Sequence, residues 1–221
     1  ATIPRAYELA TTYRRQGVPV VIGGCHASAL PEEVACFADA AFVGQAEGAW
    51  SQVLEDLESG RLQPLYRGGM PPLAGLPLPR RDLYPHRYRF EAVLTSKGCP
   101  HACEFCSVWK SYERRTLFRP VDEVLDELAW LRARHLFFVD DNLAANRAHA
   151  IALCRGMAER RLGKRFAIQA SLDAALDDEL LASLQRAGCF LVSVGLESTD
   201  EITLHLGLER DWWHAHRESD P

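Results

Sequence analysis

"EAVLTSKGCPHACEFCSVW", residues 91–109, joins a short apolar run directly to three closely spaced cysteines. Residues 91–97 have the apolar, β-branched character of a strand, so the cysteines are predicted to lie on the loop at its carboxyl end. Cys99, Cys103 and Cys106 are separated by three and then two intervening residues, with no fourth cysteine nearby. Structural zinc sites take four ligands, and disulfides take cysteines in pairs. Three thiols on one loop therefore predict a metal centre that keeps one position open.

The composition is that of a globular protein with one or two domains, since 48% of the 221 residues are apolar. A net charge of −5 gives no overall attraction for nucleic acid or an anionic membrane, so neither is expected as a partner. No transmembrane segment or signal peptide is recognisable. Seven cysteines, an odd number, indicate thiols in a reducing, cytoplasmic setting. Cys36, Cys154 and Cys189 fall in helix or strand patterns and are predicted to be small buried side chains.

Residues 1–63 alternate between helix and strand patterns, which is typical of a doubly wound α/β sheet. The predicted helices cover 4–16, 31–38 and 47–60, and the predicted strands cover 18–24 and 39–44. In the last helix, Trp50, Val53, Leu54 and Leu57 are predicted to face inward. Two strands alone do not make a stable sheet, so we expect this region to be the C-terminal part of a larger domain.

Two segments are expected to lie outside the α/β regions. Six of the twelve prolines fall within residues 64–85, which predicts a semi-rigid extended linker over 64–88 without helix or central strand. Residues 204–221 match no pattern and form an unassigned tail.

Residues 89–203 resume the alternation and predict an incomplete parallel (β/α) barrel of four strand–helix units. The predicted strands cover 91–97, 135–142, 165–171 and 189–198, and the predicted helices cover 120–135, 147–161 and 177–187. Polar residues follow each strand, and the carboxyl ends of parallel strands form the functional edge of such folds. We therefore expect these polar side chains to share one edge with the cysteines.

The cysteine spacing, together with Phe105, resembles the signature of the radical S-adenosylmethionine (radical SAM) superfamily. The resemblance implies that Cys99, Cys103 and Cys106 bind three irons of a 4Fe-4S cluster. The fourth iron would take the amino and carboxylate groups of S-adenosylmethionine, which explains why three cysteines suffice. The implied chemistry is reductive cleavage of a carbon–sulfur bond to give a 5′-deoxyadenosyl radical that abstracts hydrogen. Phe105 would pack beside the adenine.

The resemblance also implies cofactor-binding positions after the other strands. Asp140, Asp141 and Asn142 stand where the superfamily often has Gly-Gly-Glu, whose acid receives the methionine ammonium; capping of the strand end is the alternative. Gln169, Ser193 and Glu197 occupy positions that the family uses for ribose hydroxyls and the carboxylate. Ordinary polarity of a barrel is the alternative for these three.

The first region, through "VVIGGCHASALPEE" (20–33) and "FVGQAEGAW" (42–50), resembles the cobalamin-binding Rossmann-like domain that precedes many radical SAM barrels. Gly23 and Gly24 would let the backbone approach the corrinoid, and His26 matches a recurrent family position. The Asp-x-His-x-x-Gly motif of base-off cobalamin domains is absent from the sequence. Both regions have fewer strands than the family domains, so we expect a chain truncated at both ends.

"CEFCSVW", "FFVDDN" and "GLES" together are most similar to the subfamily that includes hopanoid methylases. The resemblance implies cobalamin-dependent methyl transfer to an unactivated carbon. Its partners would be a small-molecule substrate, with lipids among the candidates, and an electron donor such as flavodoxin or ferredoxin. Three alternatives remain: a cobalamin-associated radical cyclase or oxidase, a tRNA-modifying enzyme, and a non-catalytic iron–sulfur or zinc module. His101 or Cys25 would be the fourth ligand of a zinc module.

Overall fold

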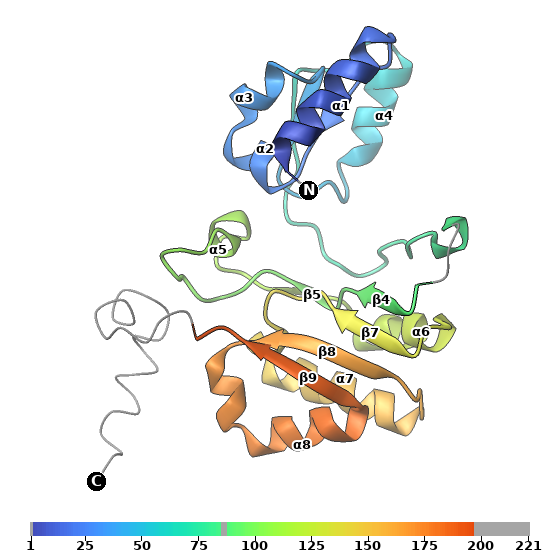
Figure 1. The fold of residues 1–221 in the computed structure, drawn as a ribbon, viewed down its shortest axis with the longest axis vertical. Helices are drawn as coiled ribbons and strands as arrows, with labels where there is room; N and C mark the ends of the chain where they lie inside the picture. Colours follow the sequence, from blue (N-terminus) through green and yellow to red (C-terminus); the bar gives the residue numbers. More distant parts are fainter. Residues whose placement is uncertain (1, 85–87, 197–221) are drawn as a thin grey trace. The chain divides into compact units, whose positions relative to one another are not determined.

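The computed structural model describes residues 2–84 and 88–196, and the chain divides into two compact units between Pro71 and Pro72 (Figure 1). Both units are α/β structures with parallel sheets, which confirms the predicted fold class. Glu197 and the unassigned tail lie outside the described residues.

The first unit is built on a parallel sheet with strand order β1-β2-β3. Its elements are α1 (Ile3–Arg15), β1 (Val21–Ile22), α2 (Cys25–Ala29), α3 (Pro31–Ala35), β2 (Ala40–Val43), α4 (Trp50–Glu58) and β3 (Leu65–Arg67). A proline stands in the first turn of both α1 and α3, where its missing N–H is not needed. The core lies on both faces of β2, with Ala41 packed toward α2 and α3 and Phe42 packed toward Val53 of α4.

The linker predicted over 64–88 contains one short edge strand, β3, because Leu65–Arg67 is free of proline and the Pro64 carbonyl accepts a hydrogen bond from Ala41 N at 3.0 Å. Two other predictions for this unit were wrong. Of the four side chains predicted to face inward on α4, only Val53 is buried. The strands are two to four residues long, so the sheet offers α4 too narrow a surface to cover Trp50, Leu54 and Leu57. Cys36 is exposed as well, contrary to the prediction.

The second unit is built on a four-stranded parallel sheet with strand order β4-β7-β8-β9. Its elements are η1 (Arg81–Leu83), β4 (Phe90–Val93), β5 (Ser96–Lys97), α5 (Val108–Ser111), β6 (Leu117–Phe118), α6 (Val121–Trp130), β7 (His135–Phe138), η2 (Leu143–Ala145), α7 (Arg147–Glu159), β8 (Arg165–Ala170), η3 (Leu172–Leu176), α8 (Asp178–Ala187) and β9 (Cys189–Val194). The four predicted strands and the three predicted helices that alternate with them are confirmed within the described residues. The strands follow one another in space in chain order, as successive βα units require.

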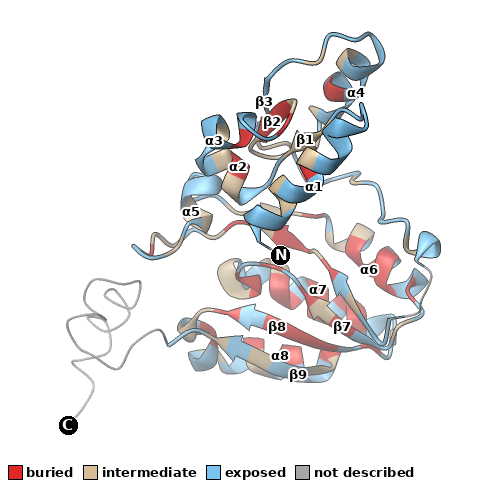
Figure 2. Ribbon diagram, turned by 45° about the horizontal axis from the view of Figure 1, so that its top comes forward, coloured by how far each residue is buried: buried red, intermediate tan, exposed pale blue. Residues whose placement is uncertain are grey.

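One hydrophobic core joins this sheet to α6, α7 and α8, which cover one face of it (Figure 1). Leu136 and Phe138 of β7 and Phe166 and Ile168 of β8 point into this core. The predicted apolar stripe of α6 is confirmed, since Val124, Leu125, Leu128 and Leu131 are buried and Val121 is partly buried. By contrast, β9 carries no fully buried residue (Figure 2).

Local signals set most helix ends correctly, with one exception. Asp177 caps α8 by accepting from Leu180 N at 3.0 Å, and Gly188 ends that helix with a φ of +102°. The helix predicted over 120–135 stops at Trp130 instead. Lys164 Nζ binds the carbonyls of Leu131 and Ala133 in the segment that follows.

A buried ion network also holds the second unit together. Glu127 of α6 is 2% exposed and pairs with Arg81 at 2.7 Å and with Arg119 at 2.6 Å. Arg81 pairs in addition with Glu91 of β4 at 2.9 Å. These contacts fasten η1, which precedes the sheet in the chain, to α6 and β4. Among the described residues, no helix has the length and apolarity needed to cross a membrane.

Candidate functional site

The three cysteines lie on a loop closed by a short antiparallel ladder. After β4, β5 pairs with β6 through Ser96 opposite Phe118 and Lys97 opposite Leu117. Gly98 begins the loop with a φ of +88°, and a side chain there would collide with the Arg115 carbonyl. Only glycine fits this turn without strain, so the glycine before Cys99 is needed to start the loop.

All three cysteines are free thiols, and they differ in exposure. Cys103 is buried, whereas Cys99 and Cys106 are half-buried. The Cys103 carbonyl accepts from the Cys106 N–H at 3.1 Å and from the indole Nε1 of Trp109 at 2.8 Å. Trp109 thus ties the end of the loop to its middle, a role that the sequence interpretation missed.

The electrostatic surroundings of Cys99 favour its neutral form. Burial raises the pKa of the Cys99 thiol, although hydrogen bonds from the His101 backbone and the Asn142 side chain act against it. Unfavourable electrostatic interactions with Cys106 and Asp141 raise this pKa further. A bound cation would reverse this balance, since it stabilises thiolates.

Asp140 stands at the end of β7 and is fully buried. Its Oδ1 accepts hydrogen bonds from the Thr95 N–H at 3.0 Å and the Thr95 hydroxyl at 2.8 Å. The same oxygen accepts from the Ser96 N–H and from the Ser96 hydroxyl. Burial raises the pKa of Asp140, and these hydrogen bonds oppose that rise. Asp140 therefore joins the end of β7 to the junction between β4 and β5.

Asp141 and Asn142 reach the start of the cysteine loop itself. Asp141 Oδ2 accepts from the Gly98 N–H at 2.8 Å. Asn142 Nδ2 lies 4.0 Å from Cys99 Sγ and donates to the Ser171 hydroxyl at 2.9 Å. The structure thus brings the predicted residues 140–142 together with the cysteine loop.

The remaining barrel positions stay predictions. Gln169 and Ser193 are register partners on β8 and β9, so the structure places them side by side, and both are exposed. Phe105, on the cysteine loop, is 61% exposed. Glu197 lies outside the described residues.

The cysteine loop fits an iron–sulfur cluster by the chemistry of its donors. Fe–S clusters are held by cysteine thiolates, and none of these three thiols is tied up in a disulfide. Within residues 2–84 and 88–196, no three His, Cys, Asp or Glu side chains are arranged to hold one metal ion. In a 4Fe-4S cluster each of the three thiolates would bind a different iron, so the three sulfur atoms need not converge on one point.

In the first unit, glycines follow all three strands at the carboxyl edge of the sheet. Gly23 and Gly24 follow β1, Gly44 follows β2, and Gly68 and Gly69 follow β3. A side chain on Gly68 would collide with the Gln45 carbonyl, while Gly24 and Gly69 border open space. This edge lets backbone approach a flat ligand closely, so it fits the predicted cobalamin site. The sequence interpretation found only the first pair. Gly44, at the end of the strand predicted over 39–44, was a usable signal, whereas Gly68 and Gly69 follow a strand that was not predicted.

His26, at the start of α2, is engaged by neighbouring helices. Its Nε2 lies 3.3 Å from the Tyr7 hydroxyl and 3.3 Å from Glu33 Oε1. Tyr7 in turn donates to Glu33 at 2.8 Å, and burial raises the pKa of Tyr7 to about 12. These contacts join α1, α2 and α3, and a ligand role for His26 stays a prediction.

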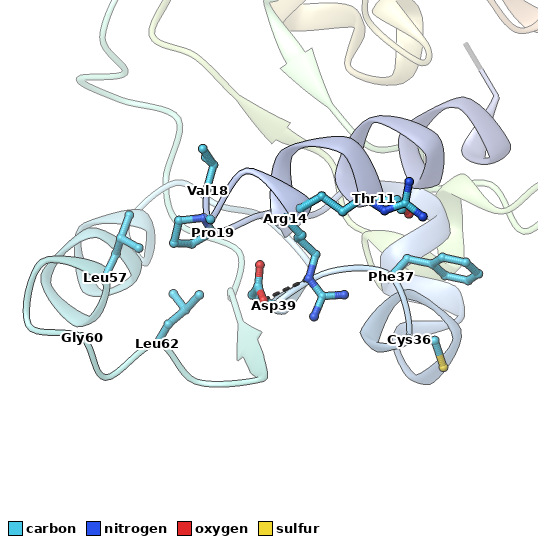
Figure 3. A pocket seen from close by; sticks show the side chains of 12 residues that line it. Thr11, Arg14, Val18, Pro19, Cys36, Phe37, Asp39, Leu57, Gly60 and Leu62 are labelled. Atoms are coloured by element: carbon cyan, nitrogen blue, oxygen red, sulfur yellow. Dashed lines mark hydrogen bonds and ion pairs between the residues drawn. The ribbon is translucent and has the colours of Figure 1, made fainter.

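A hollow of about 870 Å³ lies at the opposite, amino-terminal edge of this first sheet (Figure 3). Val18, Asp39 and Leu62 line it, each shortly before a strand, and Arg14 pairs with Asp39 at 3.1 Å. Ligands of open α/β sheets bind at the carboxyl ends of the strands. The hollow is therefore separate from the candidate cofactor edge.

Comparison with known proteins places these features in a family. The model of the radical SAM superfamily matches residues 93–215. A bacteriochlorophyllide d C-12(1)-methyltransferase of Chlorobaculum tepidum is 28% identical over 87% of this chain and 45% of its own length. The hopanoid C-2 methylase of Rhodopseudomonas palustris is 28% identical over 85% of this chain and 38% of its own length. The chain thus spans about half the length of these relatives or less.

Solved structures show the same fold. TsrM from Kitasatospora setae, a radical S-adenosylmethionine methyltransferase solved with tryptophan and aza-SAM, matches with a TM-score of 0.78 and 21% identity, over 91% of this chain and 46% of its own. A second structure of TsrM, with cobalamin and a [4Fe-4S] cluster bound, matches with a TM-score of 0.72. With its three-cysteine loop at the carboxyl end of a parallel sheet and a family match over more than half its length, this chain belongs to the radical SAM superfamily.

Proposed function

We propose that the whole protein is a cobalamin-dependent radical SAM methyltransferase that adds a methyl group to an unactivated carbon of a small molecule. The observation that carries the proposal is the cysteine loop, whose three free thiols follow the first strand of a parallel sheet. The methyltransferase names of the relatives support methyl transfer as the reaction.

Cys99, Cys103 and Cys106 would hold the cluster. When bound, the cluster supplies the single electron that cleaves S-adenosylmethionine reductively. The chain itself positions the loop and presents polar groups: Gln169 and Ser193 offer an amide and a hydroxyl to ribose hydroxyls. The electron has to come from a redox partner, for which a flavodoxin or a ferredoxin is suited.

The first unit supports cobalamin as the second cofactor. Its glycine-lined carboxyl edge leaves open space beside Gly24 and Gly69, where a corrin ring could approach the backbone. TsrM, which shares the fold, was solved with cobalamin bound. Cobalamin would carry the methyl group that is transferred.

The substrate-facing side of the second sheet supports an apolar substrate. Ala92, Phe137, Ala167 and Leu191 are successive register partners across the four strands, on the face opposite the helix-covered core. A row of apolar side chains on this face suits a hydrophobic ring system. The relatives named for bacteriochlorophyllide and hopanoid substrates agree with this choice.

Anaerobic reconstitution of the chain with iron and sulfide tests the cluster. We expect about four irons per chain, and we expect S-adenosylmethionine to change the EPR spectrum of the reduced cluster. Cys103→Ala should abolish iron binding. Cys36→Ala is the control, because Cys36 is an exposed thiol of the first unit. Retention of a single zinc with no uptake of iron would contradict the proposal.

Equilibrium dialysis of the whole protein with hydroxocobalamin tests the second cofactor. Gly24→Val should abolish binding because its side chain would enter the space proposed for the corrin ring. Gly17→Val is a matched control: Gly17 also has a positive φ and open surroundings, but it precedes β1 instead of following it. Failure of the unmutated protein to bind hydroxocobalamin would remove cobalamin, and with it methyl transfer, from the proposal. Equal binding by the two variants would mean that the corrin ring does not lie beside Gly24.

A further inference from the structure

We infer that residues 140–142 position the cysteine loop and do not receive the methionine ammonium. The inference rests on the proposed function for its consequence, since the positioned loop is the one that would hold the cluster. Its basis is a set of contacts from the segment after β7 to four residues of the chain that enters the loop: Thr95, Ser96, Gly98 and Cys99.

The Asp140 carboxylate is fully buried, and only its Oδ2 has no hydrogen-bond partner among the described residues. Its Oδ1 is occupied by the backbone and hydroxyl groups of Thr95 and Ser96, which are buried as well. Buried polar groups keep such partners because leaving them unpaired is costly. Asp140 thus fixes the position at which the chain leaves β4 and enters β5.

Asp141 fixes the next point, at Gly98. The Gly98 N–H donates to Asp141 Oδ2, and the space on the other side of Gly98 is filled by the Arg115 carbonyl and Tyr112. The turn at Gly98 is therefore held from two sides. Because Cys99 is the following residue, the direction in which its thiol leaves the strand depends on this turn.

Asn142 reaches the sulfur itself. Its amide nitrogen lies 4.0 Å from Cys99 Sγ, and the same side chain exchanges hydrogen bonds with the hydroxyl and N–H of Ser171 at 2.9 and 3.4 Å. Ser171 follows β8, so Asn142 ties Cys99 to a second strand end. An amide that donates to a cluster-binding sulfur raises the reduction potential of the cluster, since hydrogen bonds to the sulfurs set that potential.

The first test separates loop positioning from ammonium binding at Asp141. Asp141→Leu removes the acceptor, so the Gly98 amide should exchange with deuterium faster in the iron-free chain, and iron uptake should fall. Asp141→Asn keeps an acceptor but loses the charge, so it should rescue both properties. A loss of S-adenosylmethionine affinity by about tenfold or more in Asp141→Asn, with iron retained, would identify Asp141 as the ammonium ligand and overturn the inference.

The second test concerns Asn142 and uses the reduction potential, which a purely structural role would not move. Asn142→Leu should lower the potential of the reconstituted cluster in an EPR-monitored titration. Asn146→Ala is the matched control: it removes an asparagine that caps α7 through the His149 N–H, without contact to the loop. Equal potentials in the unmutated chain and Asn142→Leu would overturn the role of Asn142.

The two proposals can fail separately. If the unmutated chain takes up no iron, the proposed function fails, while the exchange rate at Gly98 still decides the positioning role in the iron-free protein. If Asp141→Leu and Asp141→Asn show the same exchange at Gly98 as the unmutated chain, the positioning role is wrong whatever the iron content.

Discussion

The first unit surrounds a sheet of strands two to four residues long with two small clusters of buried side chains. The second unit packs strands of four and six residues against helices of ten and thirteen residues, around one continuous core. Buried apolar area scales with these dimensions, and so does the stabilisation it provides. The second unit can therefore hold a loop in place through its own large core. The first unit has a glycine-lined edge supported by a much smaller set of buried side chains.

The largest expected effect tests whether the two units unfold separately. Phe138 is fully buried and packs against Phe166 with ring centroids 4.8 Å apart. Phe138→Ala should lower the free energy of unfolding of the second unit by about 3–5 kcal/mol. Hydrogen exchange followed by mass spectrometry, resolved by unit, should show no change in residues 2–71. Equal loss of protection in both units would mean that they unfold as one cooperative body.

A second prediction uses the ion pairs: the second unit has a buried network as well as surface pairs, whereas the pairs of the first unit are partly exposed. Glu127→Ala leaves Arg81 and Arg119 without their buried partner and should cost about 3–5 kcal/mol in urea unfolding. Asp126→Ala is the neighbouring control, because Asp126 pairs with Arg160 at the surface and its loss should cost about 1 kcal/mol or less. In the first unit, Arg14→Ala should likewise have a small effect. Similar costs for Glu127→Ala and Asp126→Ala would show that the buried network does not stabilise the unit.

A third prediction concerns the glycine-lined carboxyl edge of the first sheet. A side chain on Gly68 would collide with the Gln45 carbonyl and approach the Phe42 ring to 3.0 Å, so Gly68→Ala should destabilise the first unit by about 1–3 kcal/mol. Gly69→Ala should be close to neutral, since Gly69 has open space around it. Thermal unfolding of the two variants measures the difference. Equal melting temperatures for the two variants would mean that the backbone at Gly68 can move away from the Gln45 carbonyl to accommodate a side chain.

The smallest expected effect concerns the pH dependence at Asp140. Burial raises the pKa of Asp140 in the folded chain above its ordinary value of 3.8. Such a carboxyl binds its proton more tightly when folded, so the protein loses stability as pH rises from the ordinary pKa to the raised one. Asp140→Asn keeps the acceptor for Thr95 and Ser96 and removes this loss. The free energy of unfolding of Asp140→Asn, minus that of the unmutated chain, should therefore rise as pH increases from 3.8 to the raised pKa and then stay constant. Urea titrations at several pH values measure this difference. A difference that is constant with pH would mean that the pKa of Asp140 is not raised.

Local patterns were sufficient for most of the second unit. The spacing of apolar residues predicted α6, α7 and α8 and the four strands that alternate with them, β4, β7, β8 and β9. Gly188 marked the end of α8. Cys99, Cys103 and Cys106 were identified by their spacing alone. In each case the determinant lies within a few residues of the feature it predicts, which is why the sequence can be interpreted there.

The first unit was harder to predict because its elements are short. Proline density averaged over residues 64–85 concealed β3, which contains no proline. Helical periodicity placed Trp50, Leu54 and Leu57 on one face with Val53, but it carries no information on how wide a surface the sheet provides. Exposure of these side chains depends on strand length and pairing, which are properties of the assembled sheet.

The amino-acid sequence by itself determined the parallel α/β class and the three-cysteine loop after the first strand of the second unit. Only the tertiary structure decided what residues 140–142 touch. The sequence offered either a ligand or capping of the strand end for these residues. In the structure Asp140 bonds to Thr95 and Ser96, and Asn142 reaches both Cys99 and Ser171. These partners are 29 to 45 residues away along the chain. They meet because β4, β7 and β8 are neighbours in one sheet and end at the same edge, a pairing that no local pattern encodes.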